Sequence, residues 1–584
     1  MDAGAVVDHL VGRGVARGST LALVIAPGPG VGLAWWGDVG LAGSVAFTDD
    51  VDAFAVVAAI ESELAPRWAL WSSATAVALA ADGVRLAKSW DAVAVHRLLF
   101  GGWRADVGRV WARVHGLSSS DLPTTGPVDL FHQGDDDLDP EEPVQADGHL
   151  KPEWIEGGWT ESSTRIARWA AVLAEVAALQ AAHPEVRIRT AHAESTAELL
   201  CAELMVDGLP MDREAMEALV SAYVGPRPTS PQEAIDLRDA RDEAVLQHVP
   251  QGIRFDLRSP TQVRSMLRVV GVEVPDTRAW RLEALRDVHP LVDALLTWRK
   301  AERVLTTFGY AWLDENLGDD GRFRGEWSGS DGAAGRMTAS AGLHNMPADL
   351  RGGVVAESGH VFIRADLGQI EPRVLAAVSG DPALARATQA DDLYAPVAAE
   401  LAVDRATAKV AVLGAMYGQT TGEGARALVG LRRSYPVAMA YLDDADRAAQ
   451  VGTDLRTYGG RLVRMGSAAL GEPGEPGTMG EREARSRAAA RGRYGRNAMV
   501  QGAAAELFKV WAVTVRARGR DLGAAVVLCL HDELLVHVPT EHADAAAALV
   551  DDALQEAAAR WAPDRSVRFL AETSVIRTWA EAKG

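Results

Sequence analysis

The chain has 584 residues, 48% of them hydrophobic, and a formal net charge of −21. At about 150 residues per domain, this length predicts roughly three or four domains with cores of their own. No apolar run approaches the roughly 20 residues that span a membrane, and we expect no secretory leader. The two cysteines, Cys201 and Cys529, exclude a disulfide scaffold and a multi-cysteine zinc site, and they favour a reducing cytoplasm.

The acidic total is only a weak argument against a nucleic-acid partner, because the charge is unevenly distributed along the chain. Residues 131–147 contain seven acids and no Lys or Arg, whereas residues 481–496 contain six Arg and two Glu. A basic surface can therefore coexist with the negative sum.

In chain order, residues 1–130 predict a compact α/β domain. Its β-like runs lie at 20–26, 30–37, 44–47, 68–72 and 75–81, and its helical stretches at 52–65 and 91–99. An acidic, proline-containing linker is expected near 133–150. Helical periodicity then dominates from 161 to about 310, and strands and helices mix from 323 onward. Residues 471–480 are rich in Gly and Pro, which predicts a mobile loop.

Two carboxylates each follow an apolar run. One run ends at Asp366, and the run 526–530 is followed by His531, Asp532 and Glu533 and then by a second apolar run. Strand, acidic turn and strand predict a hairpin with Asp532 at its tip. Asp366 and Asp532 would repel each other at close range unless cations lay between them, and carboxylate oxygens together with substrate phosphates suit Mg²⁺. The alternative is an ordinary helix N-cap and an ordinary turn residue.

A third stretch, 404–418, carries Arg405, Lys409, Leu413 and Tyr417 at every fourth position. On a helix these side chains form one stripe. Two cations followed by an apolar and an aromatic residue suit a triphosphate at one end and a base or sugar at the other. The alternative is a solvated basic edge of a helix.

Together the three stretches resemble motifs A, B and C of family A DNA polymerases, the bacterial DNA polymerase I type. Motif A is matched by Asp366, Gln369, Ile370, Glu371 and Arg373, motif B by Arg405, Lys409, Tyr417 and Gly418, and motif C by His531, Asp532 and Glu533. Residues 335–347 with Arg336, and 493–509 with Arg493, Asn497 and Gln501, resemble template- and primer-contacting segments, and 203–212, 255–263 and 289–300 resemble parts of the thumb. The likeness covers about 190–584.

The resemblance implies a role for each matched residue. Asp366 and Asp532 would bind two Mg²⁺ ions, with Mn²⁺ as an alternative, and Glu533 would lie near them. Arg405 and Lys409 would neutralise the triphosphate of a dNTP, and Lys409 would give a proton to the leaving pyrophosphate. Leu413, Tyr417, Gln369 and Glu371 would complete the dNTP site. Glu371 would exclude a ribose 2′-hydroxyl while accepting a hydrogen bond from Tyr417. The primer–template would be contacted by Arg336, Arg493, Asn497, Gln501 and His531.

Two departures from the family pattern affect the nucleotide site. Leu413 replaces the family's aromatic residue, so we expect weaker dNTP binding from the loss of stacking. The connection at 419–436 is shorter than the family leads us to expect, so closure of the fingers is expected to differ.

Pro372 replaces an apolar residue of the family. It is compatible with a helix that begins near Gln369, because a residue in the first helical turn does not need its N–H.

The fold class expected from the resemblance is α/β and α+β multidomain, with an RNase H-like exonuclease-type domain followed by a right-hand polymerase. The expected divisions are 1–185 for the exonuclease-like domain, 186–322 for the thumb, 323–380 for the first part of the palm, 381–470 for the fingers and 471–584 for the second part of the palm. No 5′-flap nuclease domain is expected before them.

The exonuclease-like domain is expected to be inactive, as in actinobacterial bifunctional 3′–5′ exonuclease/DNA polymerase proteins whose exonuclease part has degenerated. The runs 20–26 and 30–37 lack the family's Asp-x-Glu, and Trp169 and Leu173 stand where the family has Tyr and Asp. A site without these carboxylates cannot hold two Mg²⁺ ions.

The leading prediction is a monomeric DNA polymerase for repair or gap filling, cytoplasmic and associated with the nucleoid. Its partners would be primer–template DNA and dNTPs, with no membrane. Three alternatives stay open: a polymerase with residual 3′–5′ exonuclease activity, a non-catalytic DNA-binding scaffold, and a single-subunit RNA polymerase, which Glu371 disfavours.

Overall fold

The computed structural model describes residues 2–26, 30–37, 40–48, 52–120, 122–124, 139, 141–418, 424–466, 481–563 and 566–582. Most of the acidic stretch at 133–140, the start of the short connection at 419–423 and the Gly/Pro-rich loop at 471–480 lie outside these residues. The chain divides into two compact units, which we describe separately. The first comprises Met1–Asp207, Trp327–Thr338 and Ile363–Val575, and the second comprises Gly208–Glu326, Ala339–Phe362 and Ile576–Gly584.

The first unit begins with a mixed five-stranded sheet in the order β3-β2-β1-β4-β5. The central strand β1 pairs antiparallel with β2 and parallel with β4. Alternate residues of β1 contribute to different cores: Leu21 and Leu23 pack with one buried cluster, and Ala22 and Val24 with another. The sheet therefore has helices on both faces. The strands are β1 (Thr20–Ala26), β2 (Gly30–Gly37), β3 (Gly40–Phe47), β4 (Arg67–Leu70) and β5 (Ser89–Asp91), and the helices are α1 (Ala3–Gly12), α2 (Ala53–Leu64), α3 (Ser73–Ala81), α4 (Ala92–Phe100), α5 (Val107–Val114) and α6 (Pro152–Ile155).

The prediction of a strand at 75–81 is wrong. Residues 75–81 are not a strand but belong to α3. The buried residues Ala76, Leu79 and Ala80 follow a helical spacing rather than an alternation. Four alanines within the segment also favour a helix, because alanine has the highest helix propensity of all residues.

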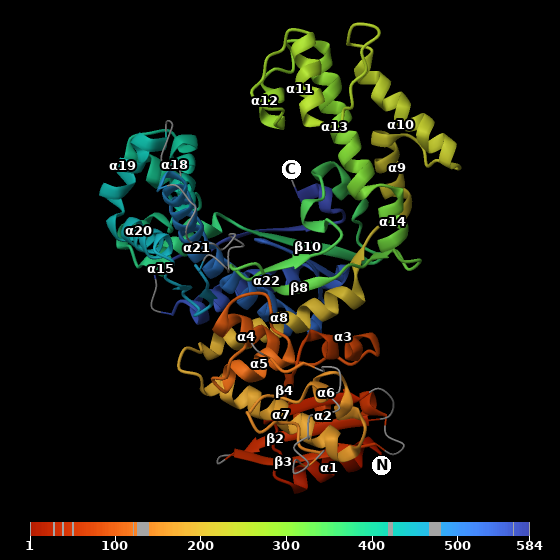
Figure 1. Cartoon of the computed structure of the whole chain (residues 1–584), viewed down its shortest axis with the longest axis vertical. Coiled ribbons are helices and arrows are strands. Elements are labelled where there is room, and N and C mark those ends of the chain that lie inside the picture. The colour runs from red at the N-terminus through yellow and green to blue at the C-terminus, as the bar shows by residue number, and fades with distance from the viewer. Residues whose placement is uncertain are drawn as a thin grey trace, which may run out of the picture. The chain divides into compact units, whose positions relative to one another are not determined.

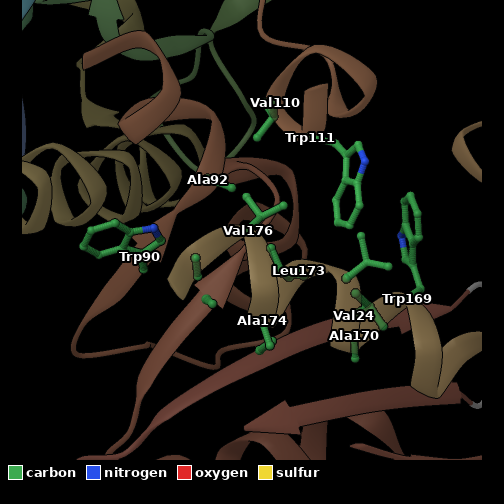
Figure 2. Close-up of a cluster of buried hydrophobic side chains, with 14 of the residues drawn as sticks. Val24, Trp90, Ala92, Val110, Trp111, Trp169, Ala170, Leu173, Ala174 and Val176 are labelled. Atoms are coloured by element: carbon green, nitrogen blue, oxygen red, sulfur yellow. The ribbon is translucent and has the colours of Figure 1, made fainter. Parts of the chain in front are cut away.

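Helix α7 (Ser163–Ala182) packs against β1, β2 and β3 of this sheet. Figure 2 shows its side chains Trp169, Leu173 and Val176 within a cluster that also contains Val24 and Trp111. Leu173 is fully buried and Trp169 is nearly so. This face of the sheet is therefore filled with apolar groups.

A second sheet of the first unit has the strand order β13-β14-β10-β15. Strands β13 (Ala525–Leu530) and β14 (Glu533–Pro539) pair antiparallel, with Leu530 opposite Glu533. This register leaves His531 and Asp532 as the turn, so the predicted hairpin with Asp532 at its tip is confirmed. The other two strands are β10 (His360–Leu367) and β15 (Ala571–Ile576).

Helices α8 and α21 pack against β13 of this second sheet and α22 packs against β14; all three helices are labelled in Figure 1. The predicted helix start near Gln369 is confirmed, because Gln369 is the N-cap of α15 and Pro372 falls in the first turn. The helices are α8 (Ile188–Asp207), α15 (Ile370–Ser379), α16 (Pro382–Ala387), α17 (Tyr394–Leu401), α18 (Arg405–Tyr417), α19 (Gly424–Ser434), α20 (Pro436–Gln450), α21 (Glu481–Gly519) and α22 (Ala543–Trp561), and the short strands are β8 (Trp327–Asp331), β9 (Arg336–Ala339), β11 (Leu455–Arg456) and β12 (Leu462–Val463).

A buried ionic cluster links α8 to α21 and to the turn between β11 and β12. Glu194 on α8 accepts a hydrogen bond from Nζ of Lys509 at 2.7 Å and pairs with Arg461 through the same oxygen. All three side chains are at most 3% exposed. Burial would raise the pKa of Glu194, but the two cations outweigh it and hold that pKa below its ordinary value.

The second unit is mostly helical, which confirms the helical periodicity predicted before residue 310. Its core cluster includes Val263, Leu267, Leu291 and Leu295 from α11 and α13. Its helices are α9 (Arg213–Val224), α10 (Pro231–Leu246), α11 (Pro260–Val269), α12 (Ala279–Glu283), α13 (Pro290–Phe308) and α14 (Tyr310–Asn316), and its two short strands are β6 (Leu209–Pro210) and β7 (Arg322–Phe323). Among the helices described in either unit, none combines the length and the hydrophobicity needed to cross a bilayer.

Candidate active site

Asp366 and Asp532 are brought to adjacent strand ends in the first unit. Asp366 is the next-to-last residue of β10, and Asp532 lies in the turn that follows β13. The backbone N–H of Leu367 donates a hydrogen bond to the carbonyl oxygen of Asp532 at 2.8 Å. This bond fixes the end of β10 beside the turn between β13 and β14, so the two acids are neighbours, as their sequence pattern predicted.

Both carboxylates have raised pKa values, and the charge of Asp366 contributes to the shift of Asp532. The pKa of Asp532 is raised to about 6 by burial and then by the charges of Asp366 and Glu533. Burial also raises the pKa of Asp366, where the charge of Arg364 opposes the shift and those of Glu533 and Glu572 add to it. The site thus concentrates negative charge in a partly buried place.

The donor chemistry of this pair suits a small divalent cation. Asp366 and Asp532 offer carboxylate oxygens, which Mg²⁺ prefers and Mn²⁺ accepts. A cation between them would also relieve the repulsion that raises the pKa of Asp532. The residues present therefore fit a magnesium centre.

A strained backbone lies next to each of the two acids, three residues after Asp366 and immediately before Asp532. Gln369 has φ of 56° and His531 has φ of 40°, a left-handed conformation that residues other than glycine rarely adopt. Such conformations persist where the surrounding structure imposes them, and they are frequent at functional sites.

The stripe on α18 has the predicted helical geometry. Asp404 is the N-cap of this helix, and its side chain accepts the backbone N–H of Thr407. Arg405, Lys409, Leu413 and Tyr417 all line one cavity of 510 Å³. Much of the rest of α18 is buried, including Ala408, Ala411, Val412, Ala415 and Met416. Arg405, Lys409 and Tyr417 stay exposed to solvent while they border the cavity.

The same cavity collects most of the other predicted residues. Besides the stripe, it is lined by Arg336, Met337, Gln369, Ile370, Glu371, Pro372, Tyr394, Gln501, Ala504, Ala505, Phe508, His531 and Asp532. Asp366, Glu533, Arg493 and Asn497 do not line it. Arg493 is an exposed residue of α21 and packs over Gly418, where an added Cβ would meet its Cγ at 2.7 Å. Asn497 is half-buried on the same helix, between Arg493 and Gln501 in helical spacing.

Glu371 and Tyr417 form the hydrogen bond that the resemblance implied. The phenolic oxygen of Tyr417 donates to Oε2 of Glu371 at 2.9 Å. Burial raises the pKa of Tyr417, and the carboxylate of Glu371 adds to the shift. Glu371 is therefore held at the wall of the cavity by a partner from another helix.

Asp392 organises two of the predicted residues, and sequence reasoning missed it. Nε2 of Gln369 donates to Oδ1 of Asp392 at 2.7 Å, and Nε of Arg405 donates to Oδ2 at 2.5 Å. Oε1 of Gln369 accepts the N–H of Leu393 at 2.8 Å. Burial would raise the pKa of Asp392, but the hydrogen bonds from Arg405 and Gln369 outweigh it and lower that pKa. Its position directly after a second acid, Asp391, gave no sign of this role.

Arg364 is the other residue that the sequence reasoning missed. Its Nη2 donates to Oδ2 of Asp366 at 2.7 Å, and its Nε donates to Oε1 of Glu533 at 2.8 Å. The available signal was a single cation inside an apolar strand two residues before Asp366. A side chain two residues before Asp366 lies on the same face of the strand as Asp366.

In the N-terminal sheet, the described residues of strands β1 to β4 form no comparable acidic cluster. Those four strands contain no Asp or Glu. On β5, Asp91 is buried, and its side chain caps α4 by accepting the N–H of Ala94 at 2.8 Å. Burial raises the pKa of Asp91 well above its ordinary value, and the charge of Glu198 raises it further.

The chain is similar in sequence to known proteins. The family model described as DNA polymerase family A matches residues 236–581. The thermostable DNA polymerase I of Thermus filiformis is 31% identical over 325 residues, which cover 52% of this chain and 38% of that protein. DNA polymerase I of Deinococcus radiodurans is 27% identical over 395 residues, which cover 60% of this chain and 38% of that protein. The chain thus spans under two fifths of the length of either relative.

A solved structure extends the likeness of fold to the whole chain. The POL domain of Pol1 from M. smegmatis, solved in complex with DNA primer–template and dNTP, aligns with a TM-score of 0.68 and 21% sequence identity. The alignment covers 100% of this chain and 99% of that domain. At this identity the match establishes the fold.

Proposed function

Because this chain belongs to DNA polymerase family A, we propose that it is a template-directed DNA polymerase that adds dNTPs to a primer 3′ end. The observation that carries the proposal is the meeting of Asp366 and Asp532 at adjoining strand ends, with Asp532 on the wall of the cavity that the α18 stripe lines. A non-catalytic scaffold would have no need to keep two mutually repelling carboxylates in a partly buried site.

The carboxylates of Asp366 and Asp532 would hold the two Mg²⁺ ions. When bound, these ions would lower the pKa of the primer 3′-hydroxyl and neutralise charge on the leaving pyrophosphate. Glu533 is buried and bonded to Arg364, so it contributes charge nearby rather than an obligatory ligand.

The cations of α18 would bind the triphosphate. Nε and Nη2 of Arg405 both donate to Asp392, and this contact fixes the orientation of the planar guanidinium group. Lys409 lines the cavity one turn further and would supply a proton from Nζ to the leaving pyrophosphate. Gln369 would act through Asp392, to which it is bonded. Leu413 would lie against the base or sugar.

Sugar selection would be the task of Glu371 and Tyr417. A carboxylate fixed by the Tyr417 hydroxyl would occupy the space of a ribose 2′-hydroxyl, so dNTPs would be favoured over rNTPs. This is the reason to prefer a DNA polymerase over an RNA polymerase.

The DNA would be contacted by residues on several elements of the first unit. Arg336 and His531 line the cavity, as does Gln501 of α21, and Arg493 and Asn497 precede Gln501 at intervals of four residues. Binding of primer–template should weaken as salt rises, because phosphate contacts release counterions. We propose a monomer that works in repair or gap filling in the cytoplasm, at the nucleoid.

We also propose the domain division of the family: an exonuclease-like domain at 1–185 with the RNase H-like fold, a thumb at 186–322, a palm at 323–380 and 471–584, and fingers at 381–470. The mixed sheet β3-β2-β1-β4-β5 supports the first of these. The helical second unit supports a thumb within 208–326.

Proofreading is proposed to be absent. Trp169 and Leu173, at the positions where the family has Tyr and Asp, are buried in the apolar cluster of Figure 2. The test is a labelled primer with a mismatched 3′ end, incubated with Mg²⁺ and no dNTP. The mismatch should persist; its removal by both the parent chain and Asp532→Ala would establish an exonuclease and the bifunctional alternative.

Primer extension tests the main proposal. The parent chain should extend a primer with dNTPs and only poorly with rNTPs, and Asp532→Ala should bind the same DNA without extending it. Asp552→Ala, which removes an exposed acid of α22, is the matched control. DNA binding without extension by the folded parent chain would favour the scaffold, and preference for rNTPs would favour an RNA polymerase.

A further inference from the structure

A buried arginine lies among the carboxylates of the candidate site, and the proposed chemistry gives it no task. Arg364 is on β10, with a side chain only 6% exposed. A buried cation is strongly unfavourable unless it is paired and hydrogen-bonded. Arg364 meets this condition through two contacts that both involve acids of the site.

The two contacts use different nitrogen atoms of one planar group. Nε donates to Oε1 of Glu533 on the neighbouring strand β14, and Nη2 donates to Oδ2 of Asp366 on β10 itself. Because a guanidinium group is rigid and planar, both carboxylates are oriented by the same fork. The side chain of Glu533 is 8% exposed, so it has little room to turn away from Arg364.

We propose that Arg364 is a positioning residue that sets which divalent ion the site prefers. It engages one oxygen of Asp366 and one of Glu533, so fewer carboxylate oxygens remain to coordinate an ion. Mg²⁺ is bound by one or two carboxylates and keeps several waters, whereas Ca²⁺ takes six to eight oxygens and often takes both oxygens of a carboxylate. The fork of Arg364 therefore favours Mg²⁺ over Ca²⁺. This inference rests on the proposed polymerase site.

Arg364 has a second effect through its charge. Asp366, Asp532 and Glu533 form the negative cluster, with Glu572 also acting on Asp366. One positive charge among them lowers the affinity for every cation. Charge and geometry can be separated by substitution, because lysine keeps the charge without the planar fork, and methionine keeps only an unbranched stem of similar length, without the charge or the fork.

The experiment measures ion binding directly on the full chain, without DNA or nucleotide. Bound Mn²⁺ is followed by electron paramagnetic resonance and displaced with Mg²⁺ or with Ca²⁺. In the parent chain, Mg²⁺ should displace Mn²⁺ at a lower concentration than Ca²⁺. In Arg364→Lys, the preference for Mg²⁺ should shrink or reverse while Mg²⁺ affinity changes little. In Arg364→Met, both ions should bind about tenfold more tightly, and the preference should again shrink.

Arg516→Lys is the matched control. Arg516 is also buried, and two nitrogens of its guanidinium group contact one carboxylate. Its Nε and Nη2 each lie 2.7 Å from an oxygen of Glu203. Arg516→Lys should leave the Mg²⁺/Ca²⁺ preference unchanged. Its loss of stability measures the structural cost of replacing a buried arginine. Circular dichroism checks folding, and Arg364→Lys decides the question if Arg364→Met does not fold. An Arg364→Lys chain with the parent's ion preference would overturn the proposal.

The two proposals can fail separately. If the parent chain does not extend primers but Arg364→Lys changes the ion preference, the polymerase assignment fails and the role of Arg364 in ion selection stands. If the parent extends primers and Arg364→Lys keeps its ion preference, only the role of Arg364 fails.

Discussion

The hydroxyl of Tyr417 donates to Oε2 of Glu371 over 2.9 Å, which ties the last turn of α18 to the first turn of α15. Glu371→Ala removes the carboxylate that would exclude a 2′-hydroxyl, so the preference for dNTPs over rNTPs should fall by about 10- to 100-fold. Tyr417→Phe keeps the ring and loses one hydrogen bond worth about 0.5–1.5 kcal/mol, so its effect should be smaller. The measurement is the ratio of kcat/KM for matched dNTP and rNTP, and an unchanged ratio in Glu371→Ala would contradict the assignment.

Asp532 should make stability depend on pH. Its pKa is raised from 3.8 to about 6, so the folded chain binds this proton more readily than the unfolded chain. The resulting stabilisation is complete below pH 3.8 and is lost as pH rises through 6. At pH 8 without divalent ions, Asp532→Asn should therefore be more stable than the parent by about 1–3 kcal/mol.

Urea titrations at several pH values test this. The advantage of Asp532→Asn should shrink between pH 6 and 4, and added Mg²⁺ should narrow it at pH 8 by stabilising the parent. Asp552→Asn, at an exposed position on α22, should show no such trend. A constant advantage across the whole pH range would mean that the titration of Asp532 is not its source.

Leu413 should limit nucleotide affinity. It is half-buried and lines the cavity between Lys409 and Tyr417, so an aromatic side chain there could stack on the incoming nucleotide. Leu413→Phe should tighten apparent dNTP binding by about 1–3 kcal/mol, seen as a lower KM in single-nucleotide extension. Leu413→Met keeps an unstacked apolar group and should resemble the parent; equal KM values for all three chains would show that position 413 does not contact the base.

The buried ionic cluster should be important for stability. Glu194→Ala leaves Lys509 and Arg461 without their shared carboxylate in a site at most 3% exposed, which should cost about 3–5 kcal/mol. Glu556→Ala, which removes a carboxylate paired with exposed Arg518, should cost about 1 kcal/mol or less. The midpoints of urea unfolding compare the two, and similar midpoints would show that the buried cluster contributes little.

Local sequence pattern was sufficient where a local rule decides the structure. The apolar runs on either side of His531 and Asp532 predicted the hairpin, and the four-residue spacing from Arg405 to Tyr417 predicted their common face. The alanine-rich segment 75–81 was misassigned because short apolar runs suit either a strand or a helix, and here helix propensity prevailed.

The supporting contacts of the site could not be predicted in the same way. Asp392 is separated from Gln369 by 23 positions, and Arg364 from Glu533 by 169. Each is an ordinary charged residue until the sheet and the helices place it beside its partner. Ion pairs of this kind depend on tertiary structure, which spacing along the chain does not encode.

The hydrogen bond between Leu367 and Asp532 also makes the site sensitive to the length of its strands. Successive side chains of a strand point to opposite faces, so inserting or deleting one residue within β10 or its neighbour β14 would turn one of the two acids away from the other. The sheet could still form, with Asp366 and Asp532 on different sides. Changes of a single residue in these strands should therefore abolish the chemistry while sparing the architecture, and changes of two residues should be the smallest that keep both acids on one face.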